Sequence, residues 1–262
     1  MTFVYVIGVA AFLYFYSKLS GNSIHIYISN SNIQLYHELL TQHNDYYRNL
    51  SPAGRKKFIK RLHRFRSHKN FIGKNGLVID NKHETLISAA AIQITFGLEN
   101  YVLSNFREIM VFPDTFRFTH SDVYYKGLTG QSGKIFLSWE DFLEGYETKE
   151  DKLNLGIHEM AHALELTALL GSDTTMDFAV KYDTWKEKSN DEYHRIRNDE
   201  DSFLRNYAGK SEREFFAVCI EHFFEAPKEF SDELPDIYIP LCNLLNQDPR
   251  NAHCDYLLEK SI

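Results

Sequence analysis

Two histidines separated by three residues stand at His158 and His162, in the sequence HEMAH. Residues four apart lie on one face of an α-helix, so both imidazoles can reach one metal ion. Glu159, next to the first histidine, can approach a water molecule held at that ion and take its proton as a general base. Apolar residues flank the motif on both sides, as a half-buried helix requires. The motif indicates a hydrolytic zinc site, and the alternative is a helix with two histidines and no metal.

A catalytic zinc site needs a third protein ligand and one open position. The residues after His162 read ALELTA, so no third histidine follows at the metzincin spacing, and that class is excluded. The remaining common ligand is a carboxylate from a separate helix, which the pattern places at 211–227. Glu214 and Glu221 are seven residues apart and share one face of that helix. The residues alone leave the choice between these two open.

The composition limits the class of protein. The 262 residues can bury a full hydrophobic core, and 44% hydrophobic with 25% charged residues exclude overall disorder. A net charge of -7 argues against a nucleic-acid partner, because such proteins usually carry a basic excess. Cys219, Cys242 and Cys254 form no C-x-x-C pair, which indicates reduced thiols rather than a disulfide framework.

The N-terminal segment predicts a membrane anchor. Residues 3–16 carry no charge, and the apolar span is at the lower edge of what crosses a bilayer. Basic residues begin at Lys18, after the apolar run, so the positive-inside tendency places the remainder of the chain in the cytoplasm. The alternative is a buried N-terminal helix in a soluble cytoplasmic protein. We expect an anchor over 1–19, a linker over 20–34 and the catalytic domain over 35–262.

The periodicity of apolar residues predicts an α+β fold. Alternating segments between 107 and 138 indicate a small antiparallel or mixed sheet, and 76–80 is a further strand candidate. The helix that starts at Pro52 carries many lysines and arginines, which could contact anionic lipid head groups or form a solvated outer face. Helices are expected over 35–49, from 52 onward, and over 83–97, 139–146, 150–170, 175–190, 211–225 and 234–246.

Six strings between roughly residues 50 and 245 resemble one family. They are LSPAGRKKFIKRLHRF, KNFIGKNGLVI, REIMVFPDTF, GKIFLSWEDFLEG, NLGIHEMAHALE and YAGKSEREFFAVCIEHFFEAP. Together they resemble the Mlc titration factor A family of zinc-dependent peptidases, whose fold is related to the catalytic domain of anthrax lethal factor. The last two strings are the most specific, because they pair the zinc motif with a distant E-F-F-A segment. The resemblance implies a zincin-like metallopeptidase of the gluzincin type, with a small sheet packed on several helices.

The resemblance also implies roles for particular residues. One Zn²⁺ per chain would be held by His158, His162 and Glu214, with Glu159 as the general base. Tyr207 lies seven residues before Glu214, the spacing of a tyrosine in the related toxin domain, and is the candidate to stabilise the oxyanion. Two further residues are candidates to orient the ligands from behind, namely Glu165, where the family commonly has aspartate, and Glu221, which matches the family helix.

The expected substrate is a peptide or protein, with an aminopeptidase-like preference implied by the family. In zincins the substrate lies antiparallel along an edge strand, and the candidate edge consists of Lys134, Ile135, Phe136 and Leu137. A regulatory protein partner is possible, but no residue identifies one. The competing hypothesis is a membrane-tethered, protein-binding regulator with a gated or vestigial zinc site.

Overall fold

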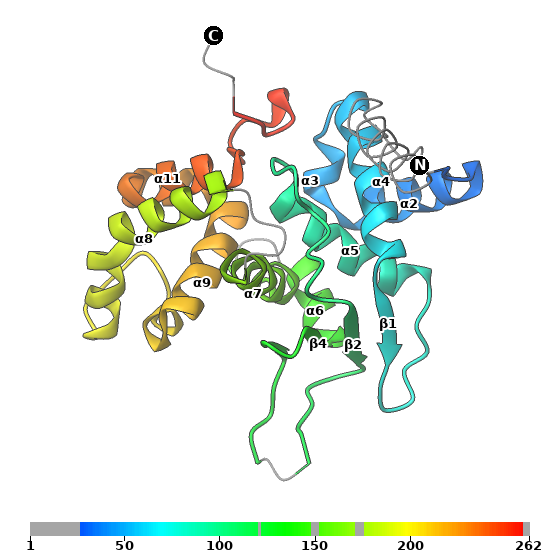
Figure 1. Cartoon of the computed structure of the whole chain (residues 1–262), viewed down its shortest axis with the longest axis horizontal. Helices are drawn as coiled ribbons and strands as arrows, with labels where there is room; N and C mark the ends of the chain where they lie inside the picture. Colours follow the sequence, from blue (N-terminus) through cyan, green and yellow to red (C-terminus); the bar gives the residue numbers. More distant parts are fainter. Residues whose placement is uncertain (1–26, 120–121, 148–151, 171–175, 259–262) are drawn as a thin grey trace, which may run out of the picture.

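The computed structural model describes residues 27–119, 122–147, 152–170 and 176–258, and it confirms the α+β class (Figure 1). The helices are α2 (Asn30–His43), α3 (Asp45–Arg48), α4 (Pro52–Ser67), α5 (Asn81–Thr95), α6 (Trp139–Glu147), α7 (Leu155–Leu169), α8 (Met176–Arg197), α9 (Glu212–Glu225), α10 (Pro227–Glu233) and α11 (Pro235–Leu245). The strands are β1 (Asn70–Gly73), β2 (Glu108–Phe112), β3 (Gly127–Thr129) and β4 (Lys134–Ser138), and the 3-10 helices are η1 (Asn206–Lys210) and η2 (Ala252–Cys254).

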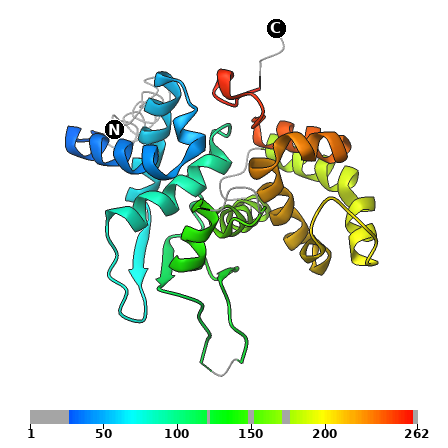
Figure 2. The same ribbon diagram turned by 180° about the vertical axis from the view of Figure 1, so that it is seen from behind.

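Helix α7 lies in the middle of the molecule. Figures 1 and 2 show α2, α4 and α5 on one side of it and α8, α9 and α11 on the other, with the sheet beneath. The helix contacts α5, α6, α8 and α9 as well as β3 and β4. Every residue of α7 from 156 to 167 is buried, the charged ones included. The HEMAH motif therefore lies at the centre of the hydrophobic core rather than on a half-exposed helix.

The sheet has the strand order β1-β2-β4-β3. Strands β1, β2 and β4 run parallel, and only β3 is antiparallel to its neighbour. Of the two expected arrangements the mixed sheet is confirmed, and between 107 and 138 only β3 and β4 pair in the antiparallel sense. The strand predicted at 76–80 is wrong, and the strand lies instead at Asn70–Gly73. The chain turns at Asn75 and Gly76, both with positive φ, and Val78 is 81% exposed.

The predicted substrate edge is an interior strand. Lys134, Ile135, Phe136 and Leu137 form most of β4, which is paired with β2 on one side and with β3 on the other. The free edge next to it is β3, Gly127–Thr129. The prediction failed because β3 has only three residues and begins at a glycine, so its segment carries no alternation that could predict a strand.

The N-terminal part of the described chain is helical earlier than expected. Helix α2 begins at Asn30, inside the predicted 20–34 linker, because the side chain of Ser29 accepts a hydrogen bond from the Asn32 backbone and caps the helix. The predicted anchor over 1–19 lies outside the described residues. Within the ranges that the structure describes, we find no helix whose length and apolar character would let it cross a membrane.

The basic helix α4 begins as predicted, at Pro52 after the N-cap Ser51. Several of its cations bind groups of the same chain. Arg61 donates to the backbone carbonyls of Thr95 and Phe96, and Arg66 pairs with Glu84. Arg61 and Arg66 therefore attach α4 to α5, a role that neither of the two alternatives had given them.

Acid should destabilise the fold through His222 of α9, which is 1% exposed and packs against the ring of Phe203. Burial lowers the pKa of His222 to about 4, while its hydrogen bond to the Val218 carbonyl opposes the shift only in part. In the unfolded chain the His222 side chain binds a proton below about pH 6.5. In the folded chain it binds that proton only near pH 4. Stability is therefore lost as the pH falls through this window, by about 3 kcal/mol at its end.

The measurement is urea unfolding between pH 7 and pH 4. The His222→Gln variant should lose less stability across that window than the wild type, because its side chain cannot take up the proton. His253→Gln, at an exposed histidine near the C-terminus, serves as the matched control and should follow the wild type. Equal pH dependence in the wild type and in His222→Gln would contradict the prediction.

Candidate active site

The motif helix α7 starts at an asparagine cap. The side chain of Asn154 accepts a hydrogen bond from the Ile157 backbone, and the helix then runs without a break through the motif. His158 and His162 lie one turn apart on the same face, and their rings meet edge to face with centroids 4.7 Å apart. The side chains of both histidines are almost wholly buried, at 10% and 6% exposure. The sequence thus places two preformed nitrogen ligands side by side.

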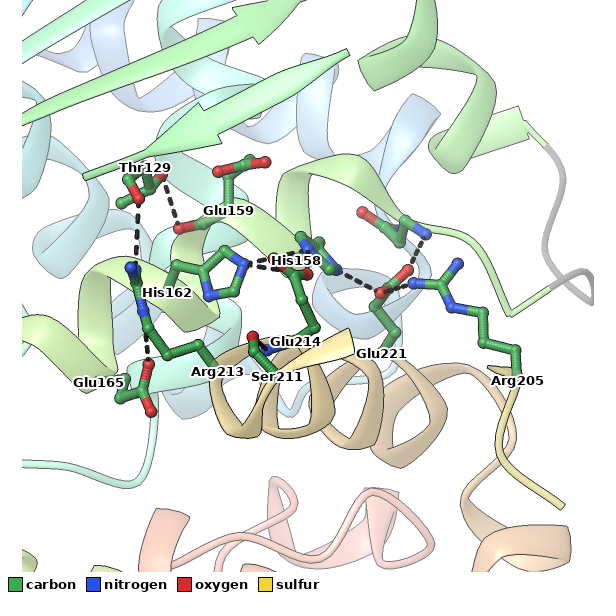
Figure 3. A network of polar contacts seen from close by, with 11 residues as sticks. Thr129, His158, Glu159, His162, Glu165, Arg205, Ser211, Arg213, Glu214 and Glu221 are labelled. Carbon is green, nitrogen blue, oxygen red and sulfur yellow. Dashed lines mark hydrogen bonds and ion pairs between the residues drawn. The ribbon is translucent and has the colours of Figure 1, made fainter. Parts of the chain in front are cut away.

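Glu214 completes the cluster from the first turn of α9. Its Oε2 lies 3.0 Å from His158 Nε2 and 3.5 Å from His162 Nε2, and the two nitrogens are 3.1 Å apart. Figure 3 shows the three side chains turned toward one another. Ligand atoms on a tetrahedral zinc ion are separated by roughly 3.4 Å. The triangle formed by these residues therefore fits a single small cation, and it is the one such group within the described residues.

Glu221 lies behind the first histidine, two turns further along the same face of α9 as Glu214. The Nδ1 of His158 donates to Glu221 Oε1 at 2.6 Å, which fixes the ring with its Nε2 facing the cluster. The other carboxylate oxygen accepts from the Asn154 backbone N–H at 2.8 Å, and Arg205 donates to Oε1. The glutamate is 1% exposed and all its charge is compensated within the protein. The structure thus separates the two glutamates: Glu214 lies in the triangle with the two histidine Nε2 atoms, and Glu221 contacts Nδ1 of His158 from behind.

The charges of the cluster compensate one another. Burial alone lowers the pKa of His158, but its hydrogen bonds with Glu214 and Glu221 outweigh burial and raise that pKa to about 10. Burial raises the pKa of Glu214, yet hydrogen bonds from His158 and His162 hold it well below its usual range. The site therefore attracts positive charge, and a metal ion that binds here must displace a proton from His158.

Glu159 is the buried acid next to the ligands. Its pKa is raised by burial, although the charges of His158 and His162 lower it in part. Its Oε2 has no hydrogen-bond partner among the described residues. The β3 strand passes directly over this residue: the Thr129 hydroxyl donates to the Glu159 carbonyl, and a β-carbon at Gly127 would collide with the Glu159 carboxylate.

Gly127 is therefore required for the position of Glu159. With Glu159 as the general base that the sequence predicts, we expect Gly127→Ala to displace the carboxylate and to lower kcat/KM by up to about 100-fold, the usual cost of moving a catalytic group by one ångström. Metal affinity should change little, because the three ligands come from α7 and α9. Hydrolysis of a chromogenic peptide, with metal content measured on the same samples, tests this. Gly130→Ala, where an added methyl group meets no atoms and the backbone has no positive φ, controls for loss of folded protein. An unchanged rate would contradict the assignment.

Tyr207 lies on η1, at the mouth of the site. Its ring centroid is 6.0 Å from that of His158, and the side chain is 41% exposed. Burial of the hydroxyl group raises the pKa of Tyr207, with Glu214 and Glu159 adding to the effect, so the phenol keeps its proton. Tyr207 lines a cavity of about 530 Å³ together with His158 and Glu159.

Glu165 meets different partners from those expected. It is 2% exposed, and among the described residues it accepts hydrogen bonds from Tyr182 and Arg213 rather than from His162. The role of orienting a metal ligand therefore does not extend to Glu165. The same Arg213 reaches the backbone carbonyl of Thr129 on β3 at 3.3 Å.

Sequence reasoning missed three residues of the site, namely Gly127, Arg205 and Arg213. Arg205 and Arg213 each stand within two residues of a predicted site residue, Tyr207 and Glu214, and this proximity was the available signal. No local pattern specifies which carboxylate or carbonyl a long arginine side chain will reach.

Two histidines on a buried helix and a carboxylate from a second helix form a donor set that can hold one metal ion, and hydrolytic zinc sites use such a set. The chain belongs to the family of glucose-regulated metallo-peptidases M90, whose model matches residues 26–245. It is 26% identical to Mlc titration factor A of Salmonella agona, over 77% of this chain and 82% of that protein. It is 27% identical to an uncharacterized protein of Synechocystis, over 74% and 76% of the two chains. The family resemblance expected from the sequence is confirmed, and a metal ion is implied.

Proposed function

We propose that this protein is a zinc metallopeptidase that hydrolyses peptide bonds near the N-terminus of its substrates. The observation that carries the proposal is the triangle of His158, His162 and Glu214, placed beside the buried and incompletely hydrogen-bonded carboxylate of Glu159. Two nitrogen ligands and one oxygen ligand are the donor set of hydrolytic zinc. When bound there, zinc would supply the Lewis acidity that makes water a nucleophile at neutral pH.

Three residues of the chain then have separate roles, in proton transfer, in stabilising the developing charge and in orienting a histidine. Glu159 takes the proton of the attacking water at its carboxylate and passes it to the leaving amine. Tyr207 is protonated, and its hydroxyl donates a hydrogen bond to the carbonyl oxygen of the substrate as negative charge develops there. Glu221 holds the His158 ring in one tautomer throughout the cycle.

The substrate is proposed to lie antiparallel along the free edge of β3, next to Glu159. The position of the cavity supports binding of few substrate residues on the N-terminal side of the scissile bond. From His158 and Glu159 it extends toward residues 124–127, which lead into β3, and toward η1. In an antiparallel arrangement, this direction holds the substrate residues that follow the scissile bond. An aminopeptidase-like preference is consistent with that asymmetry.

The test uses the full chain loaded with one equivalent of zinc and pairs of peptides with free and acetylated N-termini. We expect preferential cleavage of the free-amine peptides, with mass spectrometry placing the cut near the N-terminus, and no cleavage after chelation. Glu159→Gln is the blank. Equal cleavage of both kinds would identify an endopeptidase, and absence of cleavage in the zinc-loaded protein would overturn the enzymatic proposal.

A second candidate function is binding of a regulatory protein. Several relatives are named Mlc titration factor A, and a titration factor acts on a partner protein. The two functions differ in their dependence on Glu159. A binding function is expected to survive Glu159→Gln, whereas peptide hydrolysis is not.

A further inference from the structure

The inference concerns Arg213 and rests on the proposed function. It begins from the hydrogen bonds of β3. The Lys126 carbonyl accepts from the Ser138 backbone N–H at 2.7 Å, so this residue faces β4. In an antiparallel pair, successive residues face the neighbouring strand and the free edge in turn. Gly127 and Thr129 therefore present their backbone groups to the free edge, where a peptide would add as a further strand.

The free edge is open at one of these two residues and covered at the other. Gly127 is partly exposed, and its segment lines the cavity beside Glu159. Thr129 is 4% exposed, and its carbonyl already accepts a hydrogen bond from Arg213 Nη2 at 3.3 Å. Figure 3 shows the guanidinium group between Thr129 and Glu165, beside His162. A peptide strand can pair at Gly127 but meets the guanidinium group two residues further on.

Arg213 is held in this position by its own partner. Its Nε donates to Glu165 Oε2 at 3.3 Å, and Tyr182 donates to the other oxygen of the same buried carboxylate. Through Glu165 on α7, Tyr182 on α8 and Arg213 on α9, these contacts join three helices at the end of β3. The side chain of Arg213 is 40% exposed, so it is both fixed and accessible to an incoming peptide.

The position of the obstruction decides which end of the substrate is limited. Because β3 runs from Gly127 to Thr129, an antiparallel peptide has its N-terminal residues at Thr129 and its C-terminal residues toward Lys126. The scissile bond lies near Gly127, where Glu159 packs. We propose that Arg213 terminates the substrate-binding edge at Thr129 and thereby limits how many residues precede the bond that is cut.

The test compares a nested set of peptides that share one cleavable bond and carry increasing numbers of residues on its N-terminal side. In the zinc-loaded wild type, kcat/KM should fall by about tenfold or more once the added residues pass Thr129. A longer peptide then collides with the Arg213 guanidinium group and loses hydrogen bonds with the β3 edge. Arg213→Met should remove this length penalty. The double variant Glu165→Gln/Arg213→Met should do the same without leaving a buried carboxylate unpaired.

Lys186→Met is the matched control. Lys186 forms an ion pair with Glu212 at 2.6 Å, so the variant removes a cation beside the same helix turn without touching β3. It should keep the wild-type length penalty. A wild type that cleaves long and short peptides equally well, or a penalty that persists in both Arg213 variants, would overturn the inference.

A binding measurement separates this inference from the proposed catalysis. Fluorescence anisotropy with the same peptides on zinc-loaded Glu159→Gln, with and without Arg213→Met, reports the length limit in the absence of turnover. Binding with an Arg213-dependent length limit, but no cleavage by the wild type, supports this inference and overturns the peptidase proposal. Cleavage without the limit overturns this inference alone, and binding without either the limit or cleavage overturns both. Neither cleavage nor binding overturns both.

Discussion

Replacing Glu159 with glutamine should lower kcat/KM for peptide hydrolysis by roughly 10²- to 10⁴-fold, the range that a positioned general base contributes. Glutamine has nearly the same shape but cannot accept the proton of the attacking water. The residue is 4% exposed and lies against β3, so its carboxylate is held in one place. Steady-state kinetics on zinc-loaded protein is the measurement.

The variant should keep its metal and its stability, because the ligand triangle is formed by other side chains. Metal content and thermal unfolding of Glu159→Gln establish this. Glu187→Gln makes the same chemical change at an exposed residue of α8 and should leave the rate within error of the wild type. Residual activity above about one tenth of the wild type would show that Glu159 is not the base.

Truncation of Glu221 should have the second large effect, on both the metal site and the fold. Its carboxylate compensates His158, Arg205 and the Asn154 N–H at once, inside the core. Loss of one partner from a buried ion pair typically costs about 3–5 kcal/mol. Loss of a residue that orients a metal ligand lowers metal affinity about 10- to 100-fold. We expect Glu221→Ala to show both losses.

Denaturant unfolding and zinc titration against a competing chelator measure the two effects. Glu221→Gln is the second variant, because it fills the same volume and should retain the fold while still losing zinc affinity. The control is Glu229→Ala, which breaks the surface pair with Lys152 and should cost under about 1 kcal/mol. Wild-type zinc affinity in folded Glu221→Gln would contradict the role of Glu221.

The local part of the site could be predicted from sequence, and the long-range part only in outline. His158, Glu159 and His162 are close because helical geometry places residues three and four apart on one face. Helical spacing could also group Glu214 with Glu221, but it could not distinguish them. The distinction depends on how α9 crosses α7, which puts the first turn of α9 over the two histidine Nε2 atoms and the next turns behind one ring.

The fold shows the same division. Most helices were predicted with their type correct, since capping residues such as Ser51 and Ser211 mark their starts. The sheet was predicted less well. Its order follows from parallel pairing between β2 and β4, which are separated in sequence by the segment that contains β3. A three-residue strand carries almost no periodicity, so the true edge was assigned to its longer neighbour.

The burial of α7 on every side determines how the centre can be assembled and taken apart. The helix cannot separate from α5, α9 and the sheet without opening the whole core. Glu214 stands at the perimeter, with a side chain 24% exposed against 10% and 6% for the two histidines. An entering ion or a chelator therefore meets the carboxylate first. Exchange of an ion at this site would therefore require movement of the Glu214 side chain, while the histidine pair is held by the buried helix.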